Sequence, residues 1–172
     1  MRHYRSAAEA SIPVNFSDGQ FVVPSLFLPH SGYNDVMYEH FEHTADLGMR
    51  VRAASLDALF ADAGRGLFAM IIDNPEAIRP MESVQFEVIG SDREYLLFDW
   101  LNELLYTFES RHLLLGEFDV QFTDHGLAAI ARGETLDPIR HQLGHEVKAI
   151  TYHQFRVAET KEGWEAELIV DI

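Results

Sequence analysis

A short run between two predicted strands, His43-Thr44-Ala45-Asp46-Leu47-Gly48, brings a histidine and a carboxylate close together in the sequence. Asp46 could ligate a hard cation, because calcium and magnesium prefer carboxylate and carbonyl oxygens. His43 could act as a base or as a hydrogen-bond donor beside such a ligand. The alternative is structural, with Asp46 forming an Asx turn and His43 ending a strand. Taken alone, these residues favour the structural interpretation.

The end of the sequence, Val170-Asp171-Ile172, offers further oxygen ligands. The side chain of Asp171 and the terminal carboxylate of Ile172 are close together along the chain. With backbone oxygens they could form an all-oxygen site, which suits calcium or magnesium rather than zinc. A frayed, solvated end is the alternative, since chain ends commonly fray. The apolar alternation continues to the last residue, however, and indicates a strand held in a sheet to its end.

A third candidate group lies in the segment Leu143–His153, where Lys148 and His153 flank the predicted start of a strand. These residues could neutralise a phosphate or contact a partner. The alternative, favoured from these residues alone, is a solvated lysine and a histidine with satisfied hydrogen bonds. The sequence has no Gly-rich phosphate loop followed by lysine and no G-x-S-x-G motif. It has no cysteine, which excludes disulfides, thiolate zinc sites and cysteine nucleophiles.

The composition limits the kinds of partner. The 172 residues include 13 basic and 28 acidic side chains, a formal net charge of −15. Nucleic-acid binders neutralise phosphates with clustered lysine and arginine, so direct and tight binding of RNA is not expected. An acidic protein can still dock on a basic protein partner. No apolar run is as long as the ~20 residues of a membrane span, and the first residues do not resemble a signal peptide. We therefore expect a cytoplasmic protein with no membrane contact.

The chain divides at about residue 37. Residues 1–36 contain Pro13, Pro24 and Pro29 among polar residues, and we predict a flexible N-terminal extension. The alternatives are a segment that packs on the domain or on a partner, and a start codon assigned too early, with Met37 as the true start. Residues 37–172 carry regular apolar patterns, and the hydrophobic fraction of the chain, 47%, is sufficient for a core. We predict one domain over these residues.

Two helices and seven strands are predicted in this domain. Ser55 is the predicted N-cap of a helix that runs to about Ile72, and Ser91-Asp92-Arg93-Glu94 has the form of a capping box before a second helix, which ends near Ser110. Apolar alternation predicts strands over residues 38–43, 48–54, 83–89, 118–122, 127–134, 150–158 and 164–170. We predict an α+β fold, a two-layer sandwich in which one mostly antiparallel or mixed sheet carries both long helices on one face.

Four segments resemble the archease family, in the family's order. They are Tyr38–Gly48, with His-Thr-Ala-Asp after an apolar strand, Phe98–Tyr106 in the second helix, Gly144–His153, with Lys-Ala-x-Thr-Tyr-His, and the Asp171-Ile172 end. The resemblance covers residues 37–172 and does not extend to residues 1–36. Each motif alone is modest, but four in register are specific.

The resemblance implies a helper of another enzyme. Archeases accelerate turnover of a GTP-dependent RNA ligase that joins tRNA halves during splicing or repairs cleaved RNA, and they assist guanylylation of that ligase's active-site histidine. The family's metal site corresponds to Asp46, Asp171 and Ile172, with a divalent cation expected to be calcium and magnesium as the alternative. By this resemblance the chain is a protein cofactor of an RNA-splicing ligase rather than an enzyme. His43, Lys148 and His153 are then candidates for contact with the partner.

Two other functions are open at this point. A metal-dependent hydrolase could use Asp46 with His43 and His153, and it would show phosphatase or nuclease turnover with magnesium, manganese or calcium. A general chaperone-like interaction module would show holdase activity with unrelated clients.

Overall fold

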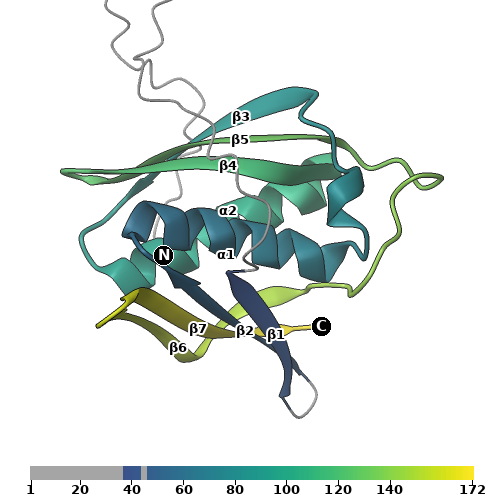
Figure 1. Cartoon of the computed structure of the whole chain (residues 1–172). Helices are drawn as coiled ribbons and strands as arrows, with labels where there is room; N and C mark the ends of the chain where they lie inside the picture. Colours follow the sequence, from purple (N-terminus) through teal and green to yellow (C-terminus); the bar gives the residue numbers. More distant parts are fainter. Residues whose placement is uncertain (1–36, 44–45) are drawn as a thin grey trace, which may run out of the picture. The chain divides into compact units, whose positions relative to one another are not determined.

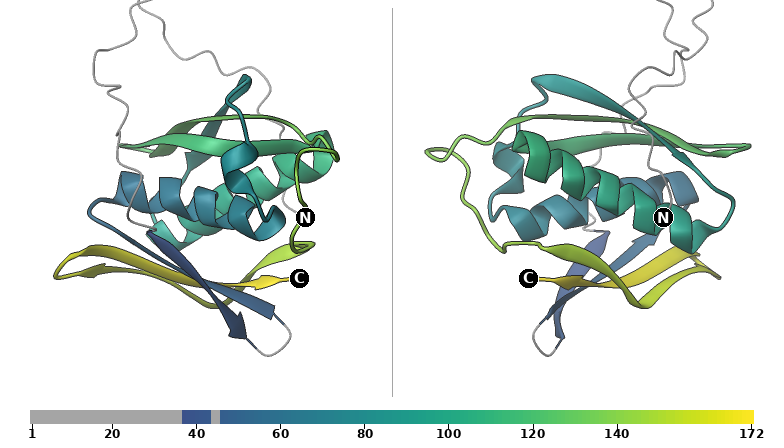
Figure 2. Two further views of the ribbon diagram at one scale, coloured as in Figure 1. Left: turned by 45° about the vertical axis from the view of Figure 1, so that its right-hand side comes forward. Right: turned by 180° about the vertical axis from the view of Figure 1, so that it is seen from behind.

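The computed structural model describes residues 37–43 and 46–172. The predicted extension, residues 1–36, lies outside the described residues. In the described part of the chain, two helices lie between two antiparallel sheets (Figures 1 and 2). The first sheet has the strand order β1-β2-β7-β6 and comprises β1 (Tyr38–His43), β2 (Asp46–Ala53), β7 (Gly163–Asp171) and β6 (Ala149–Thr160). The second has the order β3-β5-β4 and comprises β3 (Glu82–Ile89), β5 (Gly126–Thr135) and β4 (Leu113–Thr123).

The prediction of an α+β fold with two long helices and antiparallel strands is confirmed. The structure differs from the prediction in the number of sheets, because the seven strands divide between two sheets and the helices form a middle layer. The first helix, α1 (Leu56–Ile71), buries residues around much of its circumference, including Phe60, Ala63, Gly64 and Leu67. A helix buried on several sides needs more than one cover. It accordingly packs against both β2 and β4.

The two helix starts show one confirmed cap and one correction. The Ser55 side chain accepts a hydrogen bond from the Ala58 N–H at 3.2 Å, as predicted. The second helix, α2 (Arg93–Arg111), is capped by Asp92, whose carboxylate accepts from two N–H groups of the first turn at 3.0 Å each. The capping box that the sequence suggested does not form. Glu94 instead reaches β6, where its carboxylate accepts from the Val157 N–H at 3.2 Å.

The core fills the space between the two sheets. Trp100 of α2 is fully buried, and its indole N–H donates to the carbonyl of Phe60 in α1 at 3.0 Å. This bond satisfies the polar atom that burial of a tryptophan would otherwise leave unpaired. No helix in the described residues is long and apolar enough to span a membrane.

Strand β6 is less regular than its apolar alternation suggests. Thr151 pairs with Ile169 and Arg156 pairs with Glu167, so the segment Tyr152–Phe155 lies opposite a single residue of β7. Gln154 in this bulge has a φ of 55°. Bulges of this kind re-aim side chains that a regular strand would place elsewhere.

Candidate functional site

One end of the four-stranded sheet brings Asp46 and Asp171 together. Strand β2 begins at Asp46, so this carboxylate belongs to a strand and not to the predicted loop between strands. The last pair between β2 and β7 is Leu47 with Val170, and the same register places Asp46 opposite Asp171 one residue further. Directly opposite residues in an antiparallel pair have Cβ atoms about 4.5–5.5 Å apart. Two residues that are distant in sequence therefore share one end of the sheet.

Both carboxylates lie on the face of the sheet that turns away from the helices. Met49 of β2 and Val170 of β7 are fully buried in the core. Side chains alternate along a strand, so Asp46 and Asp171 lie on the opposite face. Each is partly exposed. Within residues 37–43 and 46–172, neither side chain has a hydrogen bond or an ion pair with a cation.

Further along the same face, negative charge is balanced by arginine. Arg50 pairs with Glu39 at 2.8 Å and with Glu167 at 2.6 Å, and its guanidinium lies 5.4 Å from the centre of the Phe41 ring. The Phe41 ring also covers Gly48, where a Cβ atom would come within 2.2 Å of it. A side chain in place of Gly48 would therefore force the Phe41 ring to move from its present position.

Lys148 fixes the end of the last strand. Its backbone N–H donates to the Asp171 carbonyl and its ammonium donates to the backbone oxygen of Ile172, both at 2.9 Å. Ile172 is partly buried against the core. Strand β7 therefore runs to Asp171, Ile172 is held by Lys148 and by the core, and the frayed alternative is not found. The fold thus brings Lys148 next to Asp171 and Ile172, a proximity that the sequence did not predict.

The loop before Lys148 is bound to the end of α1. The N–H groups of Gly144 and His145 donate to the carbonyls of Ile71 and Met70 at 2.9 and 2.8 Å. A Cβ atom on Gly144 would lie 2.9 Å from the Met70 carbonyl oxygen, so a side chain there would push the loop away. Val147 is buried. These contacts give Lys148 a fixed point of attachment.

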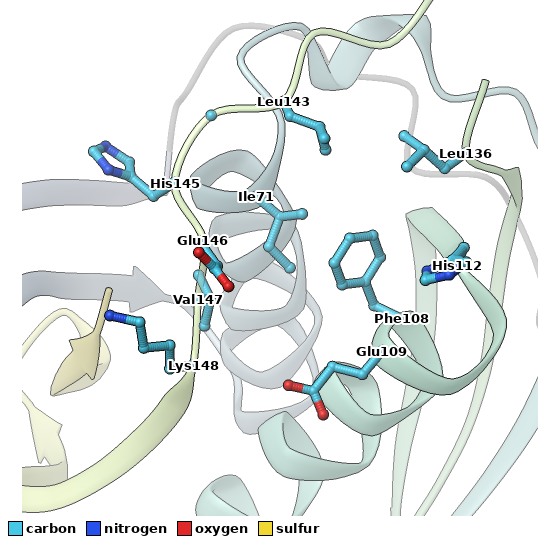
Figure 3. A pocket seen from close by; sticks show the side chains of 11 residues that line it. Ile71, Phe108, Glu109, His112, Leu136, Leu143, His145, Glu146, Val147 and Lys148 are labelled. Atoms are coloured by element: carbon cyan, nitrogen blue, oxygen red, sulfur yellow. The ribbon is translucent and has the colours of Figure 1, made fainter. Parts of the chain in front are cut away.

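The same loop closes a pocket of about 670 Å³ beside the ends of α1 and α2 (Figure 3). Its lining combines apolar side chains with a polar rim: Ile71, Phe108, Leu136, Leu143 and Val147, then Glu109, His112, His145, Glu146 and Lys148. Figure 3 shows that the Lys148 side chain points away from Phe108. Sequence reasoning did not find this pocket, because its lining comes from several separate segments that no single motif connects.

The two histidine candidates have different positions. The backbone of His43 pairs with that of Asp46, so His43 belongs to the same end of the sheet, while its side chain lies outside the described atoms. His153 is exposed and lies in the bulge of β6. The bulge is opposite Leu168, several residues along β7 from Asp171. At the sheet end, residues of the four neighbouring strands lie side by side: His43, Asp46, Asp171 and Ala149. The fold does not bring His153 to this end of the sheet.

The donor set at the sheet end fits a hard cation better than a soft one. Asp46, Asp171 and the backbone oxygen of Ile172 offer oxygen ligands, which calcium and magnesium prefer. In the described part of the chain, no three histidine, aspartate or glutamate side chains gather to hold a metal. A cation at this end would therefore need backbone or water oxygens in addition to the two carboxylates.

Sequence comparison connects these residues to known proteins. The model of the Archease protein family (MTH1598/TM1083) matches residues 38–172. The archease of Methanopyrus kandleri is 39% identical over 139 residues, which cover 78% of this chain and 99% of that protein. The archease of Pyrococcus abyssi is 40% identical over 140 residues, which cover 78% of this chain and 98% of that protein.

Solved structures share the fold. The solution structure of protein 1598 from Methanobacterium thermoautotrophicum matches with a TM-score of 0.71 at 29% identity, covering 80% of this chain and 100% of that chain. A crystal structure from Thermotoga maritima, described as an archease and "possible chaperone", matches with a TM-score of 0.58 at 19% identity, covering 77% and 94%. The family match extends over most of the sequence, from the first strand to the last residue. The chain belongs to the archease family.

Proposed function

We propose that this chain is a protein cofactor of a GTP-dependent RNA-splicing ligase, and that it promotes guanylylation and multiple turnover of the ligase through a metal-binding acidic site. The observation that carries the proposal is the position of Asp46 opposite Asp171, with no cation paired to either carboxylate among the described residues. Carboxylates left without partners on neighbouring strands repel each other, which is a cost to the fold unless a ligand offsets it.

The acidic site would hold a divalent cation through the two aspartates and the backbone oxygen of Ile172. We favour calcium, with magnesium as the alternative. When bound, such a cation supplies positive charge to phosphate oxygens. Lys148 holds the strand end in place and carries a second positive charge to the same point. Preorganised charge of this kind lowers the barrier of a phosphoryl or nucleotidyl transfer without taking part in covalent chemistry.

The partner in this proposal is a protein and not free RNA. The net charge of −15 repels phosphates, so the chain would approach the reaction by docking on the ligase. Catalytic chemistry then stays with the ligase.

The test is a guanylylation assay of the purified ligase from the same cell, with and without this chain. Wild-type protein should raise the rate of guanylylation and allow more than one turnover. Asp46→Asn should lose this effect, while Glu117→Gln, which removes an exposed carboxylate from β4, should keep it. A ligase that is equally active with and without the wild-type chain would refute the proposal.

A second candidate comes from the Thermotoga maritima relative, which is described as a possible chaperone. A holdase would suppress aggregation of unrelated clients, and it would do so with Asp46→Asn as well as with the wild-type chain. A light-scattering assay with two unrelated heat-denatured clients separates this function from ligase activation. Hydrolase activity would appear as phosphate release by the isolated chain with magnesium, manganese or calcium.

A further inference from the structure

A group of four aromatic rings lies where α2 meets the bulge of β6. We call Tyr95, Phe98, Tyr152 and Phe155 the aromatic patch. Tyr95 and Tyr152 are stacked, with ring centres 5.2 Å apart and planes 17° apart. Tyr152 is also stacked on Phe155 at 5.6 Å, and Phe98 contacts both rings of β6 edge-on. Tyr95 and Tyr152 remain 59% and 42% exposed, so the outer part of the patch faces solvent.

The patch is held rigid by the backbone around it. The bulge lets Tyr152 and Phe155 stack on each other although they are three residues apart in one strand. Glu94, next to Tyr95, accepts a hydrogen bond from the Val157 N–H and so fastens α2 to β6. Aromatic rings that are already ordered lose little conformational entropy when a ligand binds to them.

Two carboxylates lie on the same face of α2 as Tyr95, one and two turns further along the helix. Asp99 and Glu103 follow Tyr95 on α2 at helical spacing and are exposed. Neither has an ion-pair partner in the described residues. Partial burial raises the pKa of the Asp99 carboxyl, and no cation opposes that rise. The pKa of the Tyr152 hydroxyl is raised by burial first and then by its neighbours, among them Tyr95, Glu94 and Asp92.

The arginines nearby do not neutralise this surface. Arg93, two residues before Tyr95, places its guanidinium 4.5 Å from the centre of the Trp164 ring. Other arginines are paired with carboxylates elsewhere: Arg50, Arg52, Arg65, Arg79, Arg111, Arg132 and Arg140. Arg156, the residue after Phe155, is exposed and lies opposite Glu167 of β7, and within the described residues it forms no ion pair with Asp99 or Glu103. Figure 2 shows α2 in front of α1 in the right-hand view, with one sheet above it and the other below. The outer side of α2 therefore offers partly exposed tyrosine rings and carboxylates without an ion-pair partner together.

We infer that the aromatic patch and the adjacent Asp99 and Glu103 bind an arginine-bearing segment of the protein partner. A guanidinium is planar and weakly hydrated, so it can stack on a tyrosine ring while its N–H groups pair with a carboxylate. An ammonium can pair with the carboxylates but cannot stack in the same way. The surface should therefore prefer arginine to lysine. That the partner is the ligase rests on the proposed function; the arginine preference does not.

The test compares two peptides, an octamer of arginine and an octamer of lysine, in calorimetric titrations at fixed ionic strength. The wild-type chain should bind the arginine peptide more tightly. Tyr95→Leu with Tyr152→Leu should reduce that preference by roughly fivefold or more, because leucine keeps the apolar bulk and removes the π face. Tyr95→Phe with Tyr152→Phe should retain it. Tyr106→Leu is the matched control, since Tyr106 is an exposed tyrosine of the same helix outside the patch.

Two results would overturn the inference. One is equal affinity of the wild-type chain for the two peptides. The other is an unchanged preference in the leucine double variant, with its fold checked by circular dichroism. Asp99→Asn with Glu103→Gln should weaken binding of both peptides more than Glu117→Gln with Asp124→Asn, which removes the same charge from exposed positions elsewhere.

A ligase titration separates this inference from the proposed function. The leucine double variant should need a higher concentration for half-maximal activation but reach the wild-type maximum. Asp46→Asn should bind the ligase with unchanged affinity and fail to activate it. If the wild-type chain does not activate the ligase, the proposed function fails while the arginine preference is still measured by the peptides.

Discussion

Glu134 and the Asp46–Asp171 pair both place carboxylates at strand ends, but their surroundings are opposite. Glu134, near the end of β5, is only 6% exposed. It accepts hydrogen bonds from Arg140 at 2.7 and 2.8 Å and from the backbone and side chain of Arg79 at 2.8 to 3.3 Å. Asp46 and Asp171 are more exposed and have no cation partner among the described residues.

This difference separates two uses of negative charge. The hydrogen bonds from Arg140 and Arg79 hold the pKa of the Glu134 carboxyl well below its usual range. His141 joins the same group, with Nε2 3.4 Å from the Glu134 carboxylate and Nδ1 accepting from the Asp137 N–H at 2.9 Å. The Glu134 cluster therefore ties the loop of residues 137–141 to the second sheet. The sheet-end pair ties nothing together, and so it is available to a ligand.

The largest effect on stability is expected from the Glu134 cluster. Glu134→Gln should lower the free energy of unfolding by about 2–3 kcal/mol, because it leaves two arginines without their carboxylate at a buried position. Urea unfolding followed by circular dichroism measures the change. Glu117→Gln on the exposed side of β4 is the control and should change stability by less than about 0.5 kcal/mol. An equally small change in Glu134→Gln would erase the distinction between the two carboxylate sites.

Acid should reveal the same cluster in the wild-type chain. The folded-state pKa of Glu134 is below the ordinary value of 4.5, so its stabilisation is complete above that value and is lost as the pH falls towards the folded-state pKa. The free energy of unfolding of the wild-type chain should therefore fall more steeply than that of Glu134→Gln between about pH 5 and pH 3. Parallel pH profiles for the two proteins would contradict this assignment.

The sheet-end pair should behave in the opposite way. Asp46→Asn or Asp171→Asn should change the free energy of unfolding by less than about 0.5 kcal/mol without metal, because no partner is lost and one repulsion is relieved. Calcium affinity by calorimetry should fall by about tenfold or more, since cation affinity depends on the number of charged ligands. If both variants bind calcium as tightly as the wild-type chain, there is no metal site at this end of the sheet.

The Lys148→Met variant should have a smaller effect on function than the aspartate variants at the same end of the sheet. Methionine keeps the length and apolar contacts of the side chain but cannot donate to the Ile172 oxygen. The backbone bond from residue 148 to Asp171 is retained, so unfolding should change by less than about 1 kcal/mol. Ligase activation at saturating concentration should fall several-fold. Activation equal to that of the wild-type chain would limit Lys148 to a structural contact.

Removal of residues 1–36 should have the smallest effect. The family match begins at residue 38, and the described parts of both carboxylate sites lie within it. A chain that starts at Met37 should keep its unfolding free energy, its calcium affinity and its ligase activation. Loss of solubility or of activation in the shortened chain would show that residues 1–36 contribute to the domain or to partner binding.

Local features of this fold could be predicted from the sequence, and long-range ones could not. The bounds of β1 and the Ser55 cap depend on neighbouring residues, and both are confirmed. The division into two sheets depends on which strands pair, and alternation gives a strand's faces but not its partner. The capping box was predicted wrongly for a similar reason. The Glu94 carboxylate accepts a hydrogen bond from the Val157 N–H of β6, and this contact depends on the tertiary fold.

The candidate site follows the same rule. Asp46, Asp171, Ile172 and Lys148 could be selected from the sequence by resemblance, but their closeness depends on the pairing of β2 with β7. The Glu134 cluster was missed because Arg79 and Arg140 reach it from separate loops. Tyr95 lies outside the apolar stripe of α2, but its stacking on Tyr152 depends on the contact between α2 and β6, which the sequence does not reveal.

The central position of β7 has a consequence for how the chain folds. This last strand lies between β2 and β6, and its contacts with β2 join residues that are distant in sequence, such as Arg50 and Glu167, which are 117 positions apart. Pairings of such long sequence separation form slowly, because the entropy of closing a large loop is lost before the contacts contribute favourable free energy. Strands β6 and β7 form a hairpin whose turn lies between Thr160 and Gly163, so the first sheet is completed when this hairpin pairs with β2. A partially folded chain in which β7 has not yet paired with β2 would not bring the two aspartates together.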